Sequence, residues 1–475
     1  MRRKTKIICT IGPASEAPEV LDRLIEAGMD AARINFSHGT KDQHLKMYES
    51  IRAAAVRAGV ALPVIGDLQG PRIRIGRIGG TGSVELIPGS RITLTSEENP
   101  SGPGRIGTTY RFLAKDVKPG DMVLINDGLL RLEVEKTEGE DVLCLIHEGG
   151  TLTSHKGMNL PGVAISEPAL TEKDLEDFRF LIETGFDYVA LSFVMRSEDV
   201  AGAKKILAEA GSEMQVLAKI EKPEALEDLD AIIGEADGIL VARGDLGVEL
   251  GVERVPAAQK RMLREGGQKH VLTITATQML ESMIENPVPT RAEATDVANA
   301  VFDGTDALLF TGETAAGKHP VEVVSTADRI VREAEGAIEE WGDPSRRRRG
   351  SAAKNFPEAI CHSTFQAASD LGASAIVIGT QTGRTALVMS KFRPPMPVVG
   401  ISADEAAVRR MSLYHGVYPA QLPRMDEIGE SIRLATDHLL KTGLAKAGET
   451  VAMTFGEPLQ GKGLTNMMRL VKIGK

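Results

Sequence analysis

Cysteine, aromatic residues and long apolar runs are all scarce in this 475-residue chain, which has three cysteines and 4% aromatic residues. Cys9, Cys144 and Cys361 are widely spaced and odd in number, which excludes a C-x-x-C zinc site and a secreted disulfide framework. The N-terminus starts with basic residues, but the apolar run that follows is too short for a signal peptide. No segment approaches the length of a membrane span. We therefore expect a cytoplasmic protein with no membrane partner.

The chain also lacks an excess of positive charge: 56 lysines and arginines stand against 66 aspartates and glutamates, and the formal net charge is −10. This balance argues against a nucleic-acid-binding protein. The one basic block, RRRR at residues 346–349, is interpreted as a solvated linker rather than a binding patch. The chain does have length and apolar content: its length predicts about three domains, and its 42% hydrophobic residues are enough to bury sizeable cores.

Short β-branched runs alternate with helical patterns along much of the chain. Eight such runs occur, at residues 6–12, 31–37, 64–70, 188–194, 215–221, 238–244, 271–277 and 307–313. The segments between them are helical in pattern: EVLDRLIEAG at 19–28 has apolar residues at 20, 21, 24 and 25 and a terminal glycine, and EALEDLDAIIGEA at 224–236 is a second example. Strands that alternate with helices predict a parallel sheet, and eight units predict a (β/α)8 barrel.

Two further regions depart from this alternation. Residues 72–161 are rich in Gly, Thr and Val and lack a convincing helix, which predicts a small β-barrel domain inserted at the mouth of the large barrel, where we expect it to act as a lid. Residues 343–475 alternate again and predict a doubly wound α/β domain, without a G-x-G-x-x-G dinucleotide signature. The catalytic barrel is thereby assigned to residues 1–71 and 162–342.

The sequence GETAAGK at residues 312–318 matches the G-x-x-x-x-G-K part of a phosphate-binding P-loop. A P-loop needs Ser or Thr after the lysine to ligate Mg²⁺, whereas His319 and then Pro320 follow here. Pro320 suits the first turn of a helix. The stretch is therefore interpreted as a strand, loop and helix of the barrel, not as a nucleotide cradle.

Polar, mostly charged residues stand at the ends of six of the eight predicted barrel strands, where the active sites of such barrels form. They are Arg33, Asn35, Ser37 and His38; Asp67, with Arg72 and Arg74 after it; Lys219 and Glu221; Arg243 and Asp245; Thr277; and Thr311 and Glu313.

The residue types at these ends favour a particular chemistry. Glu221 and Asp245 are hard oxygen donors, and two carboxylates plus substrate oxygens are how Mg²⁺ is usually held. Lys219 lies two residues before Glu221, so on a strand both side chains point the same way. A lysine beside a metal can neutralise a transferring phosphoryl group or a developing enolate, although a Schiff-base lysine is an alternative. Arg33 and Arg74 suit anionic phosphates through forked donation.

At these residues the sequence resembles the pyruvate kinase family. The stretches that carry the resemblance, in the family's order, are KIICTIGPAS, RINFSHG, KGMNLPG, LSFV, KIEKPEAL, ARGDLGVE, ATQMLESMIENPVPTRAEATDVANAVFDG and GETAAGKHP. The resemblance implies phosphoryl transfer from phosphoenolpyruvate to ADP, giving pyruvate and ATP, with Mg²⁺ (or Mn²⁺) as the divalent metal. It also implies a homotetramer, and it makes GETAAGK the loop of the eighth barrel strand.

The resemblance also implies roles for individual residues. Arg33 would contact the transferring phosphate, and Lys219 would stabilise the phosphoryl transition state and the enolate. Glu221 and Asp245 would hold the Mg²⁺ that binds phosphoenolpyruvate, and a second metal would arrive with the nucleotide. Gly244 and Asp245 would lend backbone N–H groups to the substrate carboxylate.

Two further implied roles concern the proton and the nucleotide. Thr277 would lie near the carbon that is protonated, but Ala316 stands where many members have a lysine implicated in proton delivery, so Thr277 and ordered water both stay candidates for the donor. The nucleotide would face Asn35, His38, Arg74, Lys156 and Asn159, and Arg74 would also take part in catalysis.

One departure from the family concerns a monovalent cation. The family's better-known K⁺ site is represented by Asn35, Ser37 and Asp67, but Leu68 replaces a threonine, and Arg72 stands where many members have a glutamate. A subgroup that works without K⁺ usually has a lysine at position 72. Because arginine carries a permanent positive charge, we expect Arg72 to replace the cation and K⁺ not to be required.

The predicted C-terminal domain contains a strand-to-helix turn of the kind that binds phosphate, and GRTALVMSK resembles a bacterial subgroup activated by nucleoside or sugar monophosphates such as AMP. The alternative is a turn without a ligand. The candidate effector residues are Thr380, Thr382, Gly383, Arg384, Thr385, Lys462 and Thr465.

Two other functions compete with this one. Another Mg²⁺-dependent barrel that acts on enolates, such as an aldolase or lyase, would share the carboxylates and an arginine but would not need KGMNLPG, the insertion or the C-terminal domain. A non-catalytic paralogue that only binds effectors would have lost the charges at the strand ends, yet Arg33, Lys219, Glu221 and Asp245 are all present.

Overall fold

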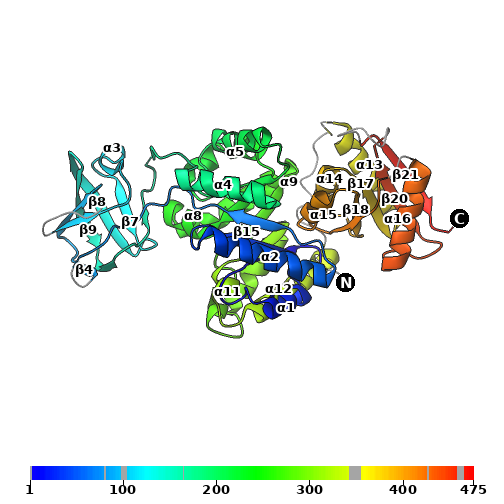
Figure 1. Cartoon of the computed structure of the whole chain (residues 1–475), viewed down its shortest axis with the longest axis horizontal. Helices are drawn as coiled ribbons and strands as arrows, with labels where there is room; N and C mark the ends of the chain where they lie inside the picture. The colour runs from blue at the N-terminus through cyan, green and yellow to red at the C-terminus, as the bar shows by residue number, and fades with distance from the viewer. Residues whose placement is uncertain are drawn as a thin grey trace.

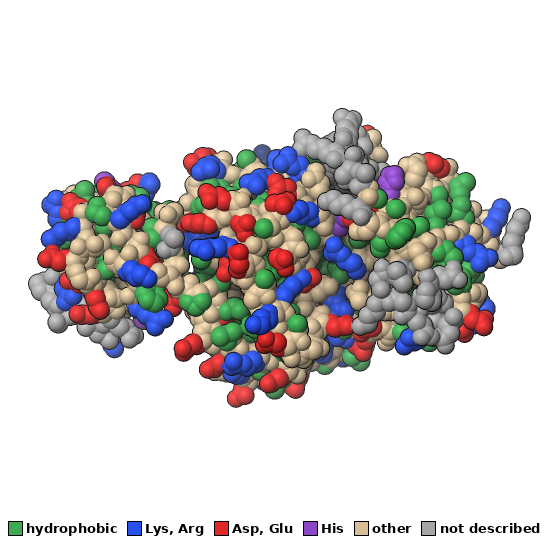
Figure 2. Space-filling view, turned by 90° about the horizontal axis from the view of Figure 1, so that it is seen from above, with side chains coloured by type: hydrophobic (Ala, Val, Ile, Leu, Met, Phe, Trp, Pro, Cys, Tyr) green, Lys and Arg blue, Asp and Glu red, His purple; other side chains and the backbone are tan. Residues whose placement is uncertain are grey.

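The computed structural model describes residues 3–79, 82–97, 104–163, 165–341, 353, 355–424, 427–456 and 465–474. Three parts lie side by side along the long axis (Figure 1): an inserted β domain at one end, a barrel in the middle and an α/β domain at the other end. On the face seen in Figure 2, acidic and basic side chains are interspersed over the barrel, while hydrophobic side chains gather on the C-terminal part. In the described ranges, no helix has the length and apolar character needed to cross a membrane.

Eight parallel strands close into the predicted barrel, which confirms the fold expected from the alternating pattern. In chain order the strands are β1 (Lys6–Thr10), β2 (Ala31–Asn35), β3 (Val64–Asp67), β12 (Tyr188–Leu191), β13 (Gln215–Ile220), β14 (Gly238–Ala242), β15 (Leu272–Ala276) and β16 (Ala307–Phe310). The period of two along a strand sets the layers. Ile7 and Cys9 of β1 pack against the surrounding helices, and Ile8 between them packs inside the barrel.

The helices around the barrel are α1 (Pro18–Ala27), α2 (Lys41–Ala58), α4 (Glu172–Thr184), α5 (Ser197–Glu209), α6 (Pro223–Glu227), α7 (Leu229–Glu235), α8 (Arg243–Leu250), α9 (Val255–Gln268), α10 (Arg291–Phe302), α11 (Gly312–Ala315) and α12 (Pro320–Trp341), with 3-10 turns η1 (Val252–Arg254) and η2 (Glu281–Ile284). The helix predicted at 19–28 is α1, and it ends at Gly28 with φ 116°, a conformation that favours glycine. The helix predicted at 224–236 is instead two short helices that meet at Asp228, whose carboxylate accepts the N–H of Ser197 at 2.7 Å.

The inserted domain, defined as β4 to β11 with α3, lies between β3 and α4. Its elements are β4 (Ser83–Leu86), β5 (Arg91–Thr95), β6 (Arg105–Gly107), α3 (Leu113–Asp116), β7 (Met122–Ile125), β8 (Leu130–Glu138), β9 (Asp141–Glu148), β10 (Gly150–Thr153) and β11 (Met158–Asn159). The domain is built from strands as predicted, but instead of the expected small closed β-barrel its described strands form a six-stranded sheet and a separate two-stranded sheet of β4 and β10. The segments that enter and leave the domain are bridged by Arg74 and Gly157, so one movement would carry both.

The C-terminal domain, α13 to β21, contains a five-stranded sheet in the order β19-β18-β17-β20-β21. The order reverses beside β17, which is the doubly wound arrangement that was predicted. Its elements are α13 (Phe356–Asp370), β17 (Ala375–Gly379), α14 (Arg384–Lys391), β18 (Val398–Ser402), α15 (Glu405–Met411), β19 (Val417–Gln421), α16 (Ile428–Thr442), β20 (Thr450–Phe455) and β21 (Met467–Lys472). The alternating pattern at residues 343–475 did not by itself predict β19 or α16. β19 contains Pro419, which obscures a strand signal.

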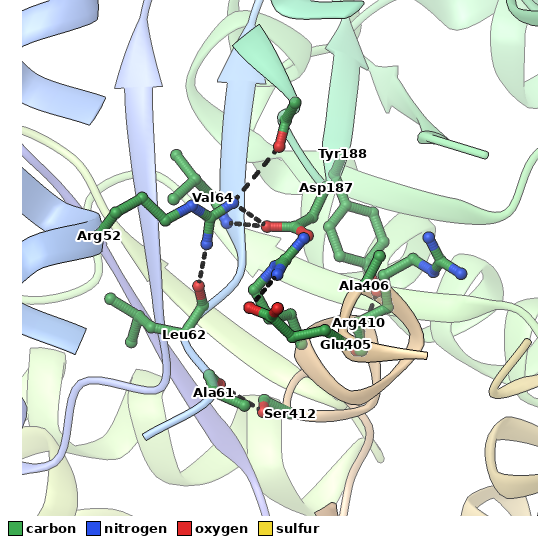
Figure 3. Close-up of polar contacts among 12 residues, drawn as sticks. Arg52, Ala61, Leu62, Val64, Asp187, Tyr188, Glu405, Ala406, Arg410 and Ser412 are labelled. Carbon is green, nitrogen blue, oxygen red and sulfur yellow. Dashed lines mark hydrogen bonds and ion pairs between the residues drawn. The ribbon is translucent and has the colours of Figure 1, made fainter. Parts of the chain in front are cut away.

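The C-terminal domain docks against the end of the barrel where the strands begin. Asp187, directly before β12, accepts hydrogen bonds from Arg52 of α2 at 2.6 Å and from Arg409 of α15 at 2.8 Å. The same carboxylate accepts the N–H of Val64 at 2.9 Å, so it joins the start of β3 to Arg52 (Figure 3) and also to Arg409. Tyr188 donates to the carbonyl of Arg410 at 3.0 Å beside it. The opposite end of the barrel, where the strands finish, is therefore left for the inserted domain and the site.

Candidate active site

One cavity opens at the carboxyl ends of the barrel strands and collects most of the residues predicted there. Its lining comprises Arg33, Asn35, Ser37, Asp67, Gln69, Arg72, Ser192, Phe193, Lys219, Glu221, Leu240, Ala242, Asp245, Ala276, Thr277, Leu309 and Thr311. Residues from all six predicted polar strand ends thus meet in one place, because parallel strands of a barrel all finish at the same rim.

A chain of alternating charges forms the floor of the cavity. Arg33 donates from Nε to Asp67 at 2.7 Å, and Lys219 Nζ lies 3.2 Å from the other oxygen of Asp67 and 3.0 Å from Glu221. Lys219 also donates to Ser192 at 2.7 Å. The lysine is held from three sides and has little freedom to turn away from the cavity.

The neighbouring charges decide the protonation states of Asp67 and Lys219. Burial alone would raise the pKa of Asp67, but Arg33 and Lys219 outweigh burial and hold it below its usual value. Burial alone would lower the pKa of Lys219, but Asp67 and Glu221 raise it above its usual value. At neutral pH Lys219 is therefore a fixed cation and Asp67 a fixed anion.

Glu221 and Asp245 provide the residues that could hold a divalent metal. Burial raises the pKa of Glu221, Lys219 opposes the shift, and the negative charge of Asp245 raises it further, so the two carboxylates are close enough to repel. Among the residues with described positions, no three His, Cys, Asp or Glu side chains converge to form a metal cage. Two carboxylates, completed by substrate oxygens and water, are the usual ligands of Mg²⁺, and the donors present fit that ion.

The loop after β15 is strained and tightly held. Thr277 has φ 68°, which is unusual for a β-branched residue. Arg243 maintains this conformation by donating to the carbonyls of Thr277 at 2.7 Å and Ala276 at 3.1 Å while it pairs with Asp296 at 2.7 Å. The N–H of Gly244, near the start of α8, donates to Thr277 Oγ1 at 2.8 Å. A substrate carboxylate that bound this N–H would have to displace the threonine hydroxyl.

Comparison with known proteins identifies the family to which this arrangement belongs. The chain matches the family described as pyruvate kinase, barrel domain, over residues 2–324 and the one described as pyruvate kinase, alpha/beta domain, over residues 358–471. The chain belongs to the pyruvate kinase family. The relatives include a pyruvate kinase of Geobacillus stearothermophilus, 43% identical over 99% of this chain and 80% of that protein. A pyruvate kinase of Clostridium acetobutylicum is 41% identical over 98% of this chain and 99% of that one. A crystal structure of a pyruvate kinase from Cryptosporidium parvum superposes with a TM-score of 0.92 at 35% identity, covering 99% of this chain and 96% of that one.

The GETAAGK loop is part of the barrel framework. Glu313 is fully buried, and its carboxylate accepts the N–H groups of Thr311 at 2.7 Å and Leu280 at 3.1 Å. Thr314 donates to the carbonyl of Thr10 at 2.9 Å and ties the loop to β1. The polar groups of the loop are engaged within the protein, in agreement with the interpretation that it is not a phosphate cradle.

Of the residues predicted to face the nucleotide, His38 and Arg74 lie in a basic surrounding. Burial and the positive charges of Arg72, Arg74 and Lys173 lower the pKa of His38. Burial and Arg72 also lower the pKa of Arg74, which donates to the carbonyl of His155 at 3.2 Å. Lys173 is paired with Asp177 at 2.6 Å, so the positive charge that favours an anionic ligand here comes mainly from Arg72 and Arg74.

The other predicted nucleotide residues lie at different places. Asn35 lines the main cavity and accepts the N–H of Ser37 at 3.1 Å. Lys156 is at the return from the inserted domain, where its carbonyl accepts from Ile75 at 2.8 Å. Asn159 donates to Glu249 of α8 at 2.8 Å and lines a neighbouring second cavity.

The candidate effector turn has the predicted strand-to-helix geometry. Gly383 has φ 87° and its N–H donates to Thr380 at 3.1 Å, and Thr385 and Thr465 share a hydrogen bond of 2.7 Å across 80 residues. The N–H of Arg384 donates to Thr382 at 3.4 Å, but its guanidinium reaches the barrel and donates to the carbonyl of His270 at 2.9 Å. Lys462 lies outside the described residues.

Proposed function

We propose that this pyruvate kinase transfers the phosphoryl group of phosphoenolpyruvate to ADP in the cavity lined by Arg33, Lys219, Glu221 and Asp245, with Mg²⁺ as the metal. The observation that carries the proposal is the Arg33–Asp67–Lys219–Glu221 chain, which holds a buried cation beside two carboxylates. The lyase or aldolase alternative is disfavoured, because relatives that match over nearly the whole chain are named pyruvate kinases.

The chemistry follows from the charges around the cavity. The bond from phosphorus to the enol oxygen breaks as a bond forms from phosphorus to an oxygen of the ADP β-phosphate. Arg33 and Lys219 stabilise the negative charge on the phosphoryl oxygens, and Lys219 also stabilises the enolate left behind. When Mg²⁺ is bound, Glu221 and Asp245 hold it, and it adds electrostatic stabilisation of the same oxygens. The enolate carbon then takes a proton, for which Thr277 and ordered water are the candidate donors.

The direct test is pyruvate formation from phosphoenolpyruvate and ADP with Mg²⁺, first in buffer free of K⁺ and then after K⁺ is added. Activity that depends on both substrates and the metal is expected. Absence of pyruvate under both conditions would contradict the proposal and favour a non-catalytic paralogue.

We further propose that catalysis does not require K⁺. Asp67, the carboxylate of the family's monovalent-cation site, is already neutralised by Arg33 and Lys219. Leu68 is buried and offers no oxygen from its side chain. Arg72 lines the cavity, is exposed, and forms no ion pair with any residue that the structure describes. Its guanidinium is therefore available to supply the positive charge.

Replacing Arg72 by glutamate should make the enzyme dependent on K⁺. Without K⁺, we expect Arg72→Glu to lower the rate by roughly tenfold or more, because one preorganised charge is lost, and K⁺ should restore much of it. Initial rates at 0 and 100 mM K⁺ measure the effect, with the exposed Arg77→Glu as a matched control that should leave the rate unchanged in both buffers. If wild type itself is active only with K⁺, the interpretation of Arg72 is wrong.

We also propose that a phosphorylated metabolite binds the turn that contains Gly383 and activates the enzyme. AMP, ribose 5-phosphate or fructose 1,6-bisphosphate should lower the phosphoenolpyruvate concentration that gives half-maximal rate, by roughly 5- to 150-fold for a typical coupling between sites. Thr382→Val should lose this response and keep the rate measured without effector. A substrate curve that none of the three compounds shifts would contradict the proposal.

From the family resemblance we also infer a cytoplasmic homotetramer. Light scattering of the purified enzyme tests the tetramer.

A further inference from the structure

A second cavity lies beside the active site, between the barrel and the inserted domain. It shares Arg72, Phe193 and Asp245 with the main cavity, and its other polar lining includes Asn159, Lys222 and Glu249. Neither Lys222 nor Glu249 has a role in the phosphoryl transfer proposed above. Both are nevertheless charged and buried close to the candidate metal ligands. Lys222 is the residue after Glu221, and Glu249 lies one helical turn after Asp245.

Lys222 and Glu249 form an ion pair that spans the two metal-binding elements. Lys222 Nζ lies 2.7 Å from Glu249 Oε1, and the side chains are 4% and 0% exposed, so water contributes almost nothing to their solvation. Lys222 directly follows Glu221 at the end of β13, and Glu249 lies four residues after Asp245, on the same face of α8. The pair therefore constrains the distance between the end of β13 and helix α8, which carry the two carboxylates.

The inserted domain joins this pair through Asn159. Its side-chain amide donates to Glu249 Oε1 at 2.8 Å, the same oxygen that binds Lys222. Asn159 belongs to β11, which pairs with β7, so the amide is anchored to the main sheet of the inserted domain. Glu249 Oε2 is buried and has no hydrogen-bond partner among the described residues. Burying a carboxylate is costly unless its contacts are well formed. Removing either Lys222 or Asn159 would therefore destabilise the buried charge of Glu249.

We propose that Glu249 is a positioning residue that couples the inserted domain to the metal-binding edge of the barrel. Through Lys222 it fixes Glu221 relative to Asp245. Through Asn159 it ties α8 to the inserted domain, which contains Lys156 and is entered through the segment that carries Arg74. The inference rests on the proposed function, because it takes Glu221 and Asp245 as the metal ligands. It adds that metal binding and nucleotide binding are linked by the contact between Glu249 and Asn159.

Metal binding can be measured without turnover. Free Mn²⁺ is titrated by electron paramagnetic resonance against wild type, Glu249→Gln, Lys222→Met and the apolar pair Lys222→Met/Glu249→Met. We expect each variant to bind Mn²⁺ at least about tenfold more weakly, as for loss of a residue that orients a metal ligand. The apolar pair keeps the test decisive if a single variant fails to fold, because it leaves no buried charge without a partner. Wild-type Mn²⁺ affinity in folded Glu249→Gln or in the pair would overturn the proposal.

The link to the inserted domain is measured by a double-mutant cycle on the KM for ADP. Asn159→Ala and Glu249→Ala should each raise this KM, and the double variant should raise it no further than the larger of the two single changes, because the two residues act through one contact. Additive effects would overturn the coupling. Glu253→Gln, an exposed glutamate just beyond α8, is the control and should match wild type. Glu221→Gln separates the two proposals: if it binds Mn²⁺ normally, the metal site of the proposed function is wrong, whatever Glu249 does.

Discussion

Lys219→Met is expected to lower kcat by at least roughly 10²–10³-fold, the usual effect of removing one preorganised donor from a developing negative charge. The lysine is 13% exposed, and Asp67 and Glu221 raise its pKa above its usual value, so it is charged at neutral pH. Methionine keeps most of the volume of the side chain and removes the charge. The initial rate of pyruvate formation at saturating phosphoenolpyruvate and ADP measures the loss.

A matched control separates chemistry from the general effect of losing a lysine. Lys205→Met removes a lysine whose side chain is 78% exposed and whose ion pair with Glu209 is long, at 3.9 Å. The variant should therefore turn over at the wild-type rate. Because Lys219→Met leaves two buried carboxylates with fewer partners, circular dichroism should first establish that the variant is folded. A folded Lys219→Met enzyme with near-normal turnover would contradict the role assigned to Lys219.

The barrel and the main cavity were accessible from sequence because both depend on regular local patterns. Each strand is a short β-branched run followed by a helix, and the polar residues come directly after the runs. Since all parallel strands of a barrel finish at one rim, residues as far apart as Arg33 and Thr277 are expected to meet, and both line the cavity. The position of the active site thus follows from strand direction, without knowledge of any particular contact.

The residues that hold the site and the domains in place could not be predicted from the sequence in this way. Arg243 was identified only as a polar strand end, yet its contacts are with the Thr277 loop and Asp296, more than 30 residues away. Lys222 and Glu249 lie within the stretches KIEKPEAL and ARGDLGVE, but neither stretch has a pattern that predicts their pairing. The pairing of Asp187 was equally unpredictable. This residue directly precedes a strand, and polar residues are common at that position. Such contacts depend on how separate elements pack, and local periodicity holds no information about that.

Asp187→Asn should be the most destabilising of the conservative changes considered, by about 3–5 kcal/mol, the usual cost of breaking a buried ion pair. The carboxylate is 1% exposed and binds Arg52 of the barrel, Arg409 of the C-terminal domain and the N–H of Val64. Asparagine keeps the shape of the side chain but loses its charge. Its NH2 group would also face at least one of the N–H groups that now donate to the carboxylate, so that a hydrogen bond would be replaced by two opposed donors. Both arginines, each 20% exposed, would then lack their main anion.

The control is an aspartate–arginine pair of similar length that faces water. Asp22 lies 2.7 Å from Arg57, close to the 2.6 Å between Asp187 and Arg52, but its side chain is 41% exposed. Asp22→Asn should therefore cost no more than about 1 kcal/mol. Urea unfolding followed by circular dichroism measures both variants, and kcat should be kept by folded Asp187→Asn, since the residue lies at the end of the barrel opposite the active site. Equal stability of the two variants would mean that the buried carboxylate is not what holds the C-terminal domain against the barrel. A large loss for Asp187→Asn alone would show that burial, and not the length of the ion pair, sets its contribution.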